Sequence, residues 1–426
     1  MTANEKIFIS IASYRDPELL PTIRDCIKRA DKPENLVFSI AWQHSAEDDW
    51  DTLEEFSNDS RFHVIDIPHN ESDGTCWARS LIQEKYTDEQ YTLQLDSHHR
   101  FVKSWDTKCK NMITQLQNEG YKKPLLTAYL PSYNPENDPQ ERVREIWKLN
   151  FDRFTPEGVI FMLPAVLENW ESRTKPVPTR FFSAHFVFTL GEFNREVPYD
   201  PNLYFHGEEI TLAVRAYTHG YDLFIPNQII AWHEYTRKGR IRHWDENKKW
   251  ESLNVYSLKR AKSLLNVDGS TQADDFGKYG FGEVRTKDDY EKYAGIRFKD
   301  RAVQQYTISY FDPPNPLYST QESYNDSFVN IFRHCLDVYK KSIPDVDWDG
   351  WVVSFEMNDG TVLERLDADR NELENLKKIE GDWYNVWRQF HTKTVPDKAI
   401  VWPFSSNQAL GDNGWGPRIE ITIPKV

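Results

Sequence analysis

Short apolar segments alternate with amphipathic ones over the first 130 residues, and this order constrains the fold more than any other feature. Residues 7–12 read as a buried strand, and Asp16-Pro17-Glu18 then opens a helix with a cap, a proline and an acid in its first turn. Further strands are expected at 36–42, 63–67, 91–96 and 125–129, with helices starting near Thr75 and Ser104. Alternating strands and helices predict an α/β fold with a mostly parallel sheet and right-handed crossovers.

The strand expected at 91–96 ends in Asp96-Ser97-His98, an acid and an imidazole two positions apart. Residues i and i+2 of an extended backbone point the same way, so Asp96 and His98 can face one cation. A carboxylate with an imidazole suits Mn²⁺ or a similar borderline metal better than Ca²⁺ or Mg²⁺, and we keep Mg²⁺ as the alternative ion. Without a metal, the same residues would form a turn in which Asp96 caps the following amides.

Two segments fall where strands of a parallel sheet end at their carboxyl side, namely residues 10–15 and 96–98. Ligands of open α/β sheets bind beyond this edge, so the architecture favours nucleotide binding. The chain lacks both GxGxxG and GxxxxGK[ST], which argues against a dinucleotide fold and a P-loop.

Composition limits the binding partners and the cellular compartment that we expect for this chain. The formal net charge of −15 disfavours non-specific binding to nucleic acid. The four cysteines are widely scattered, which argues against a disulfide framework and a zinc-thiolate site. The N-terminal apolar segment is too short for a signal peptide, and no stretch reaches the length of a membrane span, so we expect a cytoplasmic protein.

Further candidates lie along the first 300 residues. His233, at the end of a later expected strand, is a third possible metal ligand, although a lone histidine is more often structural. Arg79 can pair with phosphate or be a solvated helix charge. Glu208 and Glu209 begin a helix, where they would either complement its dipole or hold a substrate hydroxyl. The basic loop from Arg237 to His243 can cover a diphosphate.

Taken in order, these segments resemble a known enzyme family. The residues that carry the resemblance are Ile9–Pro17, Ala78-Arg79, Leu95–His98, Tyr199-Asp200-Pro201, Gly207-Glu208-Glu209 and His233. They are similar to the cytoplasmic, hydroxyproline-directed N-acetylglucosaminyltransferases and to the related polypeptide N-acetylgalactosaminyltransferases. The similarity covers about residues 5–295 of this sequence.

The resemblance implies a GT-A type nucleotide-sugar-binding domain over residues 1–300 that uses a UDP-sugar and retains anomeric configuration. It implies Mn²⁺ held at a DxD-like motif by Asp96, His98 and His233, with His99 as an alternative second ligand. Glu208 would hold the donor sugar and Glu209 would face the reacting centre. The implied donor contacts are Ala12, Ser13, Arg15, Arg79, Asp96, Ser97 and Arg237.

The resemblance predicts transfer of a sugar, GlcNAc or a related hexose, to a hydroxyl of a protein or glycan acceptor. Two other functions fit parts of the pattern. An Asp-x-His-His string also occurs in metal-dependent phosphoesterases, which would make the chain a nucleotide-sugar hydrolase. A non-catalytic sugar-binding protein is the other alternative, and the many aromatic residues would suit it.

Beyond residue 300 the sequence changes character. Strands are expected at 307–311, 351–357, 361–363, 399–402 and 418–423, with helices at 327–340 and 371–386. We therefore expect residues 301–426 to form a separate accessory module, β-rich and of the α+β class.

Overall fold

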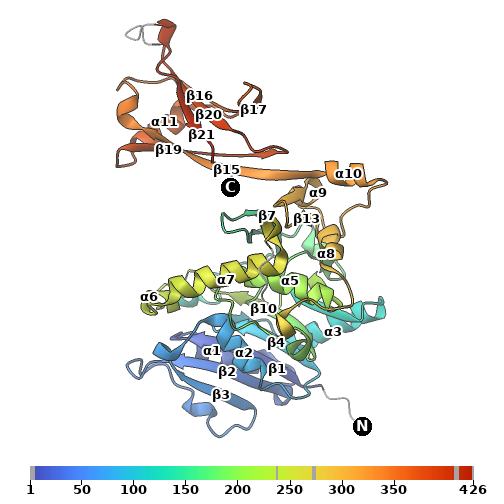
Figure 1. Ribbon diagram of the computed structural model, residues 1–426. Helices are drawn as coiled ribbons and strands as arrows, with labels where there is room; N and C mark the ends of the chain where they lie inside the picture. Colours follow the sequence, from blue (N-terminus) through green and yellow to red (C-terminus); the bar gives the residue numbers. More distant parts are fainter. Residues whose placement is uncertain (1–4, 237, 271–274, 407–411, 425–426) are drawn as a thin grey trace. The chain divides into compact units, whose positions relative to one another are not determined.

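The computed structural model describes residues 5–236, 238–270, 275–406 and 412–424. The chain forms two compact units, Met1–Leu317 and Tyr318–Val426 (Figure 1). Residues 301–317 belong structurally to the first unit, and a functional division at residue 300 stays a prediction.

The first unit is built on an eight-stranded sheet in the order β3-β2-β1-β4-β10-β6-β11-β9. Only β10 and β9 run antiparallel to their neighbours. The predicted α/β class with a mostly parallel central sheet is therefore confirmed. The strands are β1 (Ile7–Tyr14), β2 (Leu36–His44), β3 (Phe62–Pro68), β4 (Tyr91–Asp96), β6 (Lys123–Thr127), β9 (Val177–Pro178), β10 (Phe186–Leu190) and β11 (Tyr221–Ile225).

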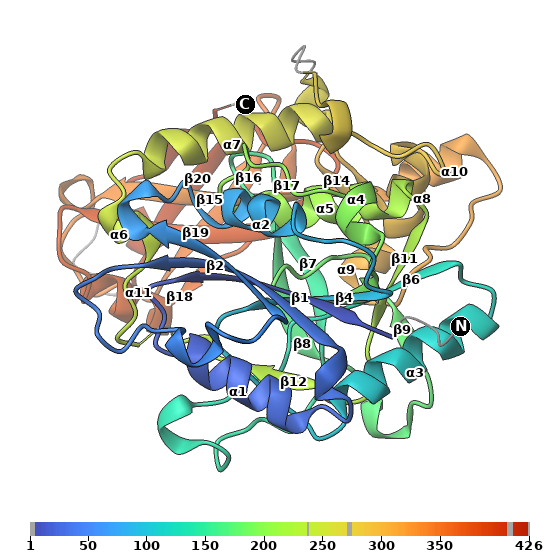
Figure 2. The same ribbon diagram turned by 90° about the horizontal axis from the view of Figure 1, so that it is seen from below.

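Helices cover both faces of this sheet (Figure 2). The odd-numbered apolar residues of β1 pack with α1 (Leu19–Arg29) and α3 (Trp105–Asn118) in the larger core. On the other face, Phe8 packs with Ala78 and Ile82 of α2 (Thr75–Gln83). Because successive side chains of a strand point to opposite faces, an uninterrupted apolar strand such as β1 is expected in a sheet covered on both sides.

Smaller elements complete the first unit. β5 (His99–Phe101) pairs antiparallel with β12 (Ala231–His233), so that His99 lies opposite His233. A hairpin of β7 (Trp147–Phe154) and β8 (Ile160–Val166) was not anticipated from the sequence. The remaining elements are α4 (Phe193–Glu196), α5 (Glu208–Thr218), α6 (His243–Glu246), α7 (Trp250–Leu265), α8 (Lys287–Ala294), β13 (Ile296–Arg297), β14 (Ala302–Gln304) and α9 (Gln305–Ile308).

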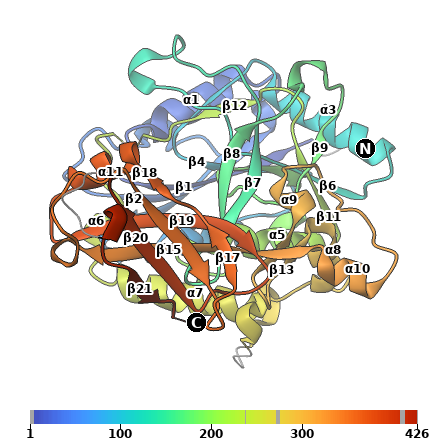
Figure 3. The same ribbon diagram turned by 90° about the horizontal axis from the view of Figure 1, so that it is seen from above.

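The second unit is rich in β-structure, as predicted, and most of its strands are labelled in Figure 3. Two of them, β15 (Phe328–Tyr339) and β19 (Trp383–Thr392), pair antiparallel along their lengths. Further strands follow the order β17-β16-β20-β21, with β18 pairing β16. The other elements are α10 (Gln321–Asp326), β16 (Gly350–Glu356), β17 (Val362–Arg365), β18 (Ala368–Asp369), α11 (Arg370–Lys377), β20 (Lys398–Phe404) and β21 (Ile419–Thr422).

Three local predictions were wrong. The segment 327–340, expected as a helix, is strand β15, and the expected helix at 371–386 ends at Lys377 before the chain enters β19. The short helix α9 occupies the start of the expected strand at 307–311. In β15, Leu336 and Val338 enter the core of the second unit, so packing against neighbouring strands overrides a pattern that also fits a helix.

Candidate active site

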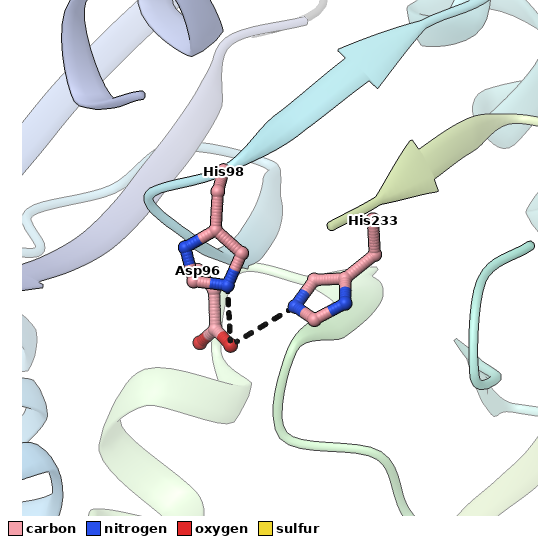
Figure 4. A group of neighbouring side chains, drawn as sticks. All are labelled: Asp96, His98 and His233. Atoms are coloured by element: carbon pink, nitrogen blue, oxygen red, sulfur yellow. Dashed lines mark hydrogen bonds and ion pairs between the residues drawn. The ribbon is translucent and has the colours of Figure 1, made fainter. Parts of the chain in front are cut away.

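Three side chains meet beyond the carboxyl end of β4 (Figure 4). Asp96 is the last residue of β4, His98 lies in the turn before β5, and His233 is the last residue of β12. One ligand atom from each residue lies within 4.8 Å of the other two. The Asp96 Oδ2 atom is 3.4 Å from His233 Nε2 and 3.8 Å from His98 Nε2.

The Asp96–His233 separation matches that expected for a shared cation, and the Asp96–His98 separation is a few tenths of an ångström wider. Ligand atoms bonded to one ion at about 2.1 Å, with angles of about 90–110°, lie roughly 3.0–3.4 Å apart. Burial and the neighbouring His185 hold the pKa of His233 well below its usual value, so its imidazole is neutral and has a lone pair to offer. The residues present therefore fit a divalent metal ion with mixed oxygen and nitrogen ligands.

Neighbouring groups fix the orientation of two of these side chains. His98 Nδ1 lies 2.7 Å from Asp16 Oδ2, which directs Nε2 toward Asp96. The second oxygen of Asp96, Oδ1, accepts a hydrogen bond of 2.6 Å from Arg79 Nη2. A carboxylate behind a histidine is a common support for a metal-binding imidazole because it sets the tautomer and the ring orientation.

His233 is held by ring contacts. Its ring stacks on His185, with centroids 4.2 Å apart and an interplanar angle of 20°. His185 is itself fixed, since its Nε2 accepts a hydrogen bond of 3.1 Å from the Leu130 amide. Burial lowers the pKa of His185 to about 3, so this ring adds no positive charge beside the candidate metal ligands.

His99 does not join the three candidate ligands. Its Nδ1 lies 3.0 Å from the backbone carbonyl of Asp96, and the side chain is fully buried. Successive residues of an extended chain point to opposite sides, so only one of the two histidines can face Asp96. Of the alternatives considered for the second ligand, the structure brings His98 rather than His99 to the candidate site.

Arg79 occupies the space between two carboxylates. Its Nη2 donates to Asp96, and its Nη1 donates to Glu208 Oε1 at 2.6 Å and to the Tyr199 hydroxyl at 3.1 Å. Only 2% of the Arg79 side chain is exposed. In this arrangement the guanidinium neutralises and positions Asp96 and Glu208, whereas the predicted phosphate contact of Arg79 stays a prediction.

The negative charge of Asp96 depends on these partners. Burial alone would raise its pKa, but the hydrogen bond with His233 and the charge of Arg79 hold the pKa well below the usual value. Asp16 behaves similarly, because its contacts with His98, Arg240 and Ser97 outweigh burial and lower its pKa. Both carboxylates are therefore ionised at neutral pH.

Glu208 and Glu209 lie at the start of α5, where the chain turns through Gly207 at a φ of 92°. Glu209 Oε1 accepts from the Ala184 amide at 2.9 Å, and Oε2 accepts from the Tyr129 hydroxyl at 3.1 Å. Burial, with the nearby charge of Glu208, raises the pKa of Glu209 to about 7. Glu209 can therefore hold or release a proton near neutral pH.

The other candidate donor-binding residues lie at the same edge of the sheet. Ala12 is the β1 neighbour of Asp96, and Ser13 follows it. The Ser97 hydroxyl donates to Asp16 Oδ2 at 2.7 Å. Arg15 is buried and pairs with Asp48 at 2.6 Å and with Glu246 of α6.

Several residues that support this edge were missed in the sequence. The sequence indicates only a helix cap at Asp16, yet its Oδ1 accepts the Glu18 amide while its Oδ2 contacts His98 and Arg240. Arg240 also pairs with Glu234, so the segment after β12 is tied to the end of β1. The expected basic loop thus contributes at least one buried ion pair, while Arg237 lies outside the described residues.

Comparison with known proteins defines the class. The model of the family described as "Glycosyltransferase (GlcNAc)" matches residues 6–60 and 50–300. The protein is therefore a glycosyltransferase. It belongs to the glycosyltransferase (GlcNAc) family, as the match spans more than half of the chain. No curated protein matches the chain.

Two solved structures are similar at low sequence identity. GalNAc-T7 with UDP, GalNAc and Mn²⁺ is 12% identical with a TM-score of 0.48, over 97% of this chain and 82% of that chain. S. aureus TarS 1–349 in complex with UDP-GlcNAc is 11% identical with a TM-score of 0.39, over 62% of this chain and 68% of that chain. In the part of the chain that the structure describes, no helix has both the length and the apolar character needed to cross a membrane.

Proposed function

We propose that the protein is a metal-dependent, retaining glycosyltransferase of the GT-A type that moves GlcNAc or a related hexose from a UDP-sugar to a hydroxyl group. The acceptor is a protein or a glycan, as in the hydroxyproline-directed transferases that the sequence resembles. The convergence of Asp96, His98 and His233 at the carboxyl edge of the sheet carries this proposal, because all three offer a ligand atom to one point.

In this proposal Asp96, His98 and His233 hold Mn²⁺, with Mg²⁺ as a second choice. A bound ion would offset the negative charge that develops on the UDP leaving group. Asp16 and Arg79 position two of the ligands from behind, through contacts of 2.7 and 2.6 Å. Ala12, Ser13, Arg15 and Ser97 would face the nucleotide, and Arg79 would lie near the diphosphate.

Glu208 and Glu209 have different proposed roles in the reaction. Glu208 is held in place by its hydrogen bond from Arg79, and we assign it to a hydroxyl of the donor sugar. Glu209 faces the reacting centre, where a carboxyl with a pKa of about 7 can accept the proton that the acceptor hydroxyl gives up. Exclusion of water from the reacting centre would favour transfer over hydrolysis of the donor.

The test measures UDP binding, and sugar release from a panel of UDP-sugars, with and without Mn²⁺, in the wild-type protein and in Asp96→Asn. We expect the substitution to weaken Mn²⁺-dependent UDP binding by about 100-fold, since it removes the anionic member of the three candidate ligands. Asp66→Asn is the matched control, because Asp66 also contacts a histidine, His44, at 2.8 Å but is 69% exposed. Wild-type metal dependence in Asp96→Asn would contradict the proposal.

A further inference from the structure

One face of the β15–β19 strand pair in the second unit carries exposed aromatic rings. Alternate residues of β19 are exposed, and among them Trp383 and Trp387 are 49% and 56% exposed. Tyr339 of β15 lies opposite Trp383 in the strand register and is 37% exposed. Large aromatic side chains usually bury most of their surface, so several exposed on one face indicate a binding surface.

Polar side chains on the same face lie between the rings. Asp337 is opposite Asn385, and Asn385 Nδ2 donates to Asp337 Oδ1 at 2.6 Å. The Tyr339 and Trp383 rings are 5.0 Å apart at an angle of 48°. Beside them is a pocket of about 280 Å³, lined by Asp337, Glu380, Gly381, Asp382, Trp383 and Asn385.

The opposite face of the strand pair is buried in the core of the second unit. Leu336, Val338, Val386 and Phe390 are buried in the hydrophobic cluster of the second unit. The fold of this unit therefore does not need the exposed rings, which contribute little to its core. Arg333 lies over the Trp387 ring at 5.0 Å from its centroid and holds it in place on the exposed face.

We propose that this face, defined by Tyr339, Trp383, Trp387, Asp337 and Asn385, binds a neutral oligosaccharide. The apolar face of a pyranose ring packs on an aromatic ring, while its hydroxyls exchange hydrogen bonds with carboxylate and amide groups. Trp383 and Trp387 are four residues apart on one strand, about 13 Å at roughly 3.3 Å per residue, which suits a short chain of sugars.

Charge selects the type of oligosaccharide. Three of the six residues that line the pocket are acidic, namely Asp337, Glu380 and Asp382. These carboxylates would repel a phosphorylated or uronic-acid polymer. A neutral glycan would not be repelled, and its hydroxyl groups can donate hydrogen bonds to the carboxylates. If this face holds the acceptor glycan, that role rests on the proposed function. The binding of a neutral oligosaccharide is proposed independently of the proposed function.

The test uses the full-length protein without metal or donor. Isothermal titration is carried out with neutral cellohexaose, chitohexaose and maltohexaose, and with anionic hexagalacturonate. We expect at least one neutral oligosaccharide to bind and to change the tryptophan fluorescence. Trp383→Ala should lower the affinity by about tenfold, the loss expected for one stacking ring, and Trp383→Phe should retain most of it.

Two variants make this result specific. Asn385→Ala should weaken binding without removing a ring, and Trp50→Ala, which removes a tryptophan that is 43% exposed in the first unit, should bind as the wild type does. The proposal is overturned if no neutral oligosaccharide binds, if hexagalacturonate binds more tightly than all of them, or if Trp383→Ala and Asn385→Ala bind unchanged. Because Asp96→Asn should leave this binding intact, failure here and failure of the proposed transferase activity can be distinguished.

Discussion

The candidate active site of the first unit and the aromatic face of the second unit use opposite physical designs. At the active site, charged groups are buried or partly buried and are held by one another, as Arg79 is held between Asp96 and Glu208. On the β15–β19 face, large rings are exposed to solvent. Stabilising developing charge requires preorganised groups away from water, whereas binding a hydrated glycan requires an accessible surface. The two sites should therefore respond very differently to single substitutions.

The largest effect is expected from Arg79→Met. Loss of the guanidinium leaves the buried Glu208 and the partly exposed Asp96 without their shared counter-charge, and we expect the free energy of unfolding to fall by about 3–5 kcal/mol. Chemical denaturation of the two proteins at pH 7 measures this difference. Arg24→Met is the control, because the Arg24–Glu55 ion pair is largely exposed and should contribute little. Equal stabilities of the Arg79 and Arg24 variants would show that the active-site charges are not interdependent.

Glu209 should make stability depend on pH. Its pKa is raised from 4.5 to about 7 in the folded protein, so between these values the folded state binds more protons than the unfolded state. The protonated form of Glu209 contributes stability that is fully present below about pH 4.5. This contribution is lost as pH rises through 7, so the free energy of unfolding falls by about 3 kcal/mol. Denaturation of wild type and Glu209→Gln from pH 5 to 8 tests this. Parallel pH profiles for the two proteins would show that Glu209 has an ordinary pKa.

A smaller effect is expected from Asp16→Asn. The substituted amide can still contact His98 but carries no charge to support the imidazole as a metal ligand, so we expect Mn²⁺ affinity to fall by about tenfold. A Mn²⁺ titration followed by electron paramagnetic resonance measures the change. Asp66→Asn, which removes the charge from the exposed carboxylate beside His44, should leave the Mn²⁺ affinity unchanged. An unchanged affinity in Asp16→Asn would remove Asp16 from the support of the metal site.

The smallest effect on stability is expected at the aromatic face. Trp383→Ala should change the free energy of unfolding by no more than about 0.5 kcal/mol, because the ring is half exposed. Trp351→Ala in the core of the same unit should cost about 3–5 kcal/mol. Thermal and chemical unfolding of both variants test this contrast. A loss at Trp383 as large as that at Trp351 would show that the exposed ring serves the fold.

The sequence determined the framework of the first unit. Strands β1, β2 and β4 were predicted correctly because a strand covered on both faces must be apolar throughout. This pattern can be recognised without knowing which strands pair with it. That Asp96 and His98 face the same side followed from the two-residue period of an extended chain. Local periodicity thus located both the sheet edge and two of the three candidate metal ligands.

Tertiary structure decided what depends on residues far apart in the chain. Asp16 contacts His98 over 82 positions and Arg240 over 224, so its support of the candidate site has no local signature. The prediction of a helix over residues 327–340 was wrong, because the apolar spacing of this segment also fits a helix. Pairing with β19 makes residues 328–339 a strand instead. Local sequence sets what each segment can form, while the burial and pairing available in the folded chain select among those forms.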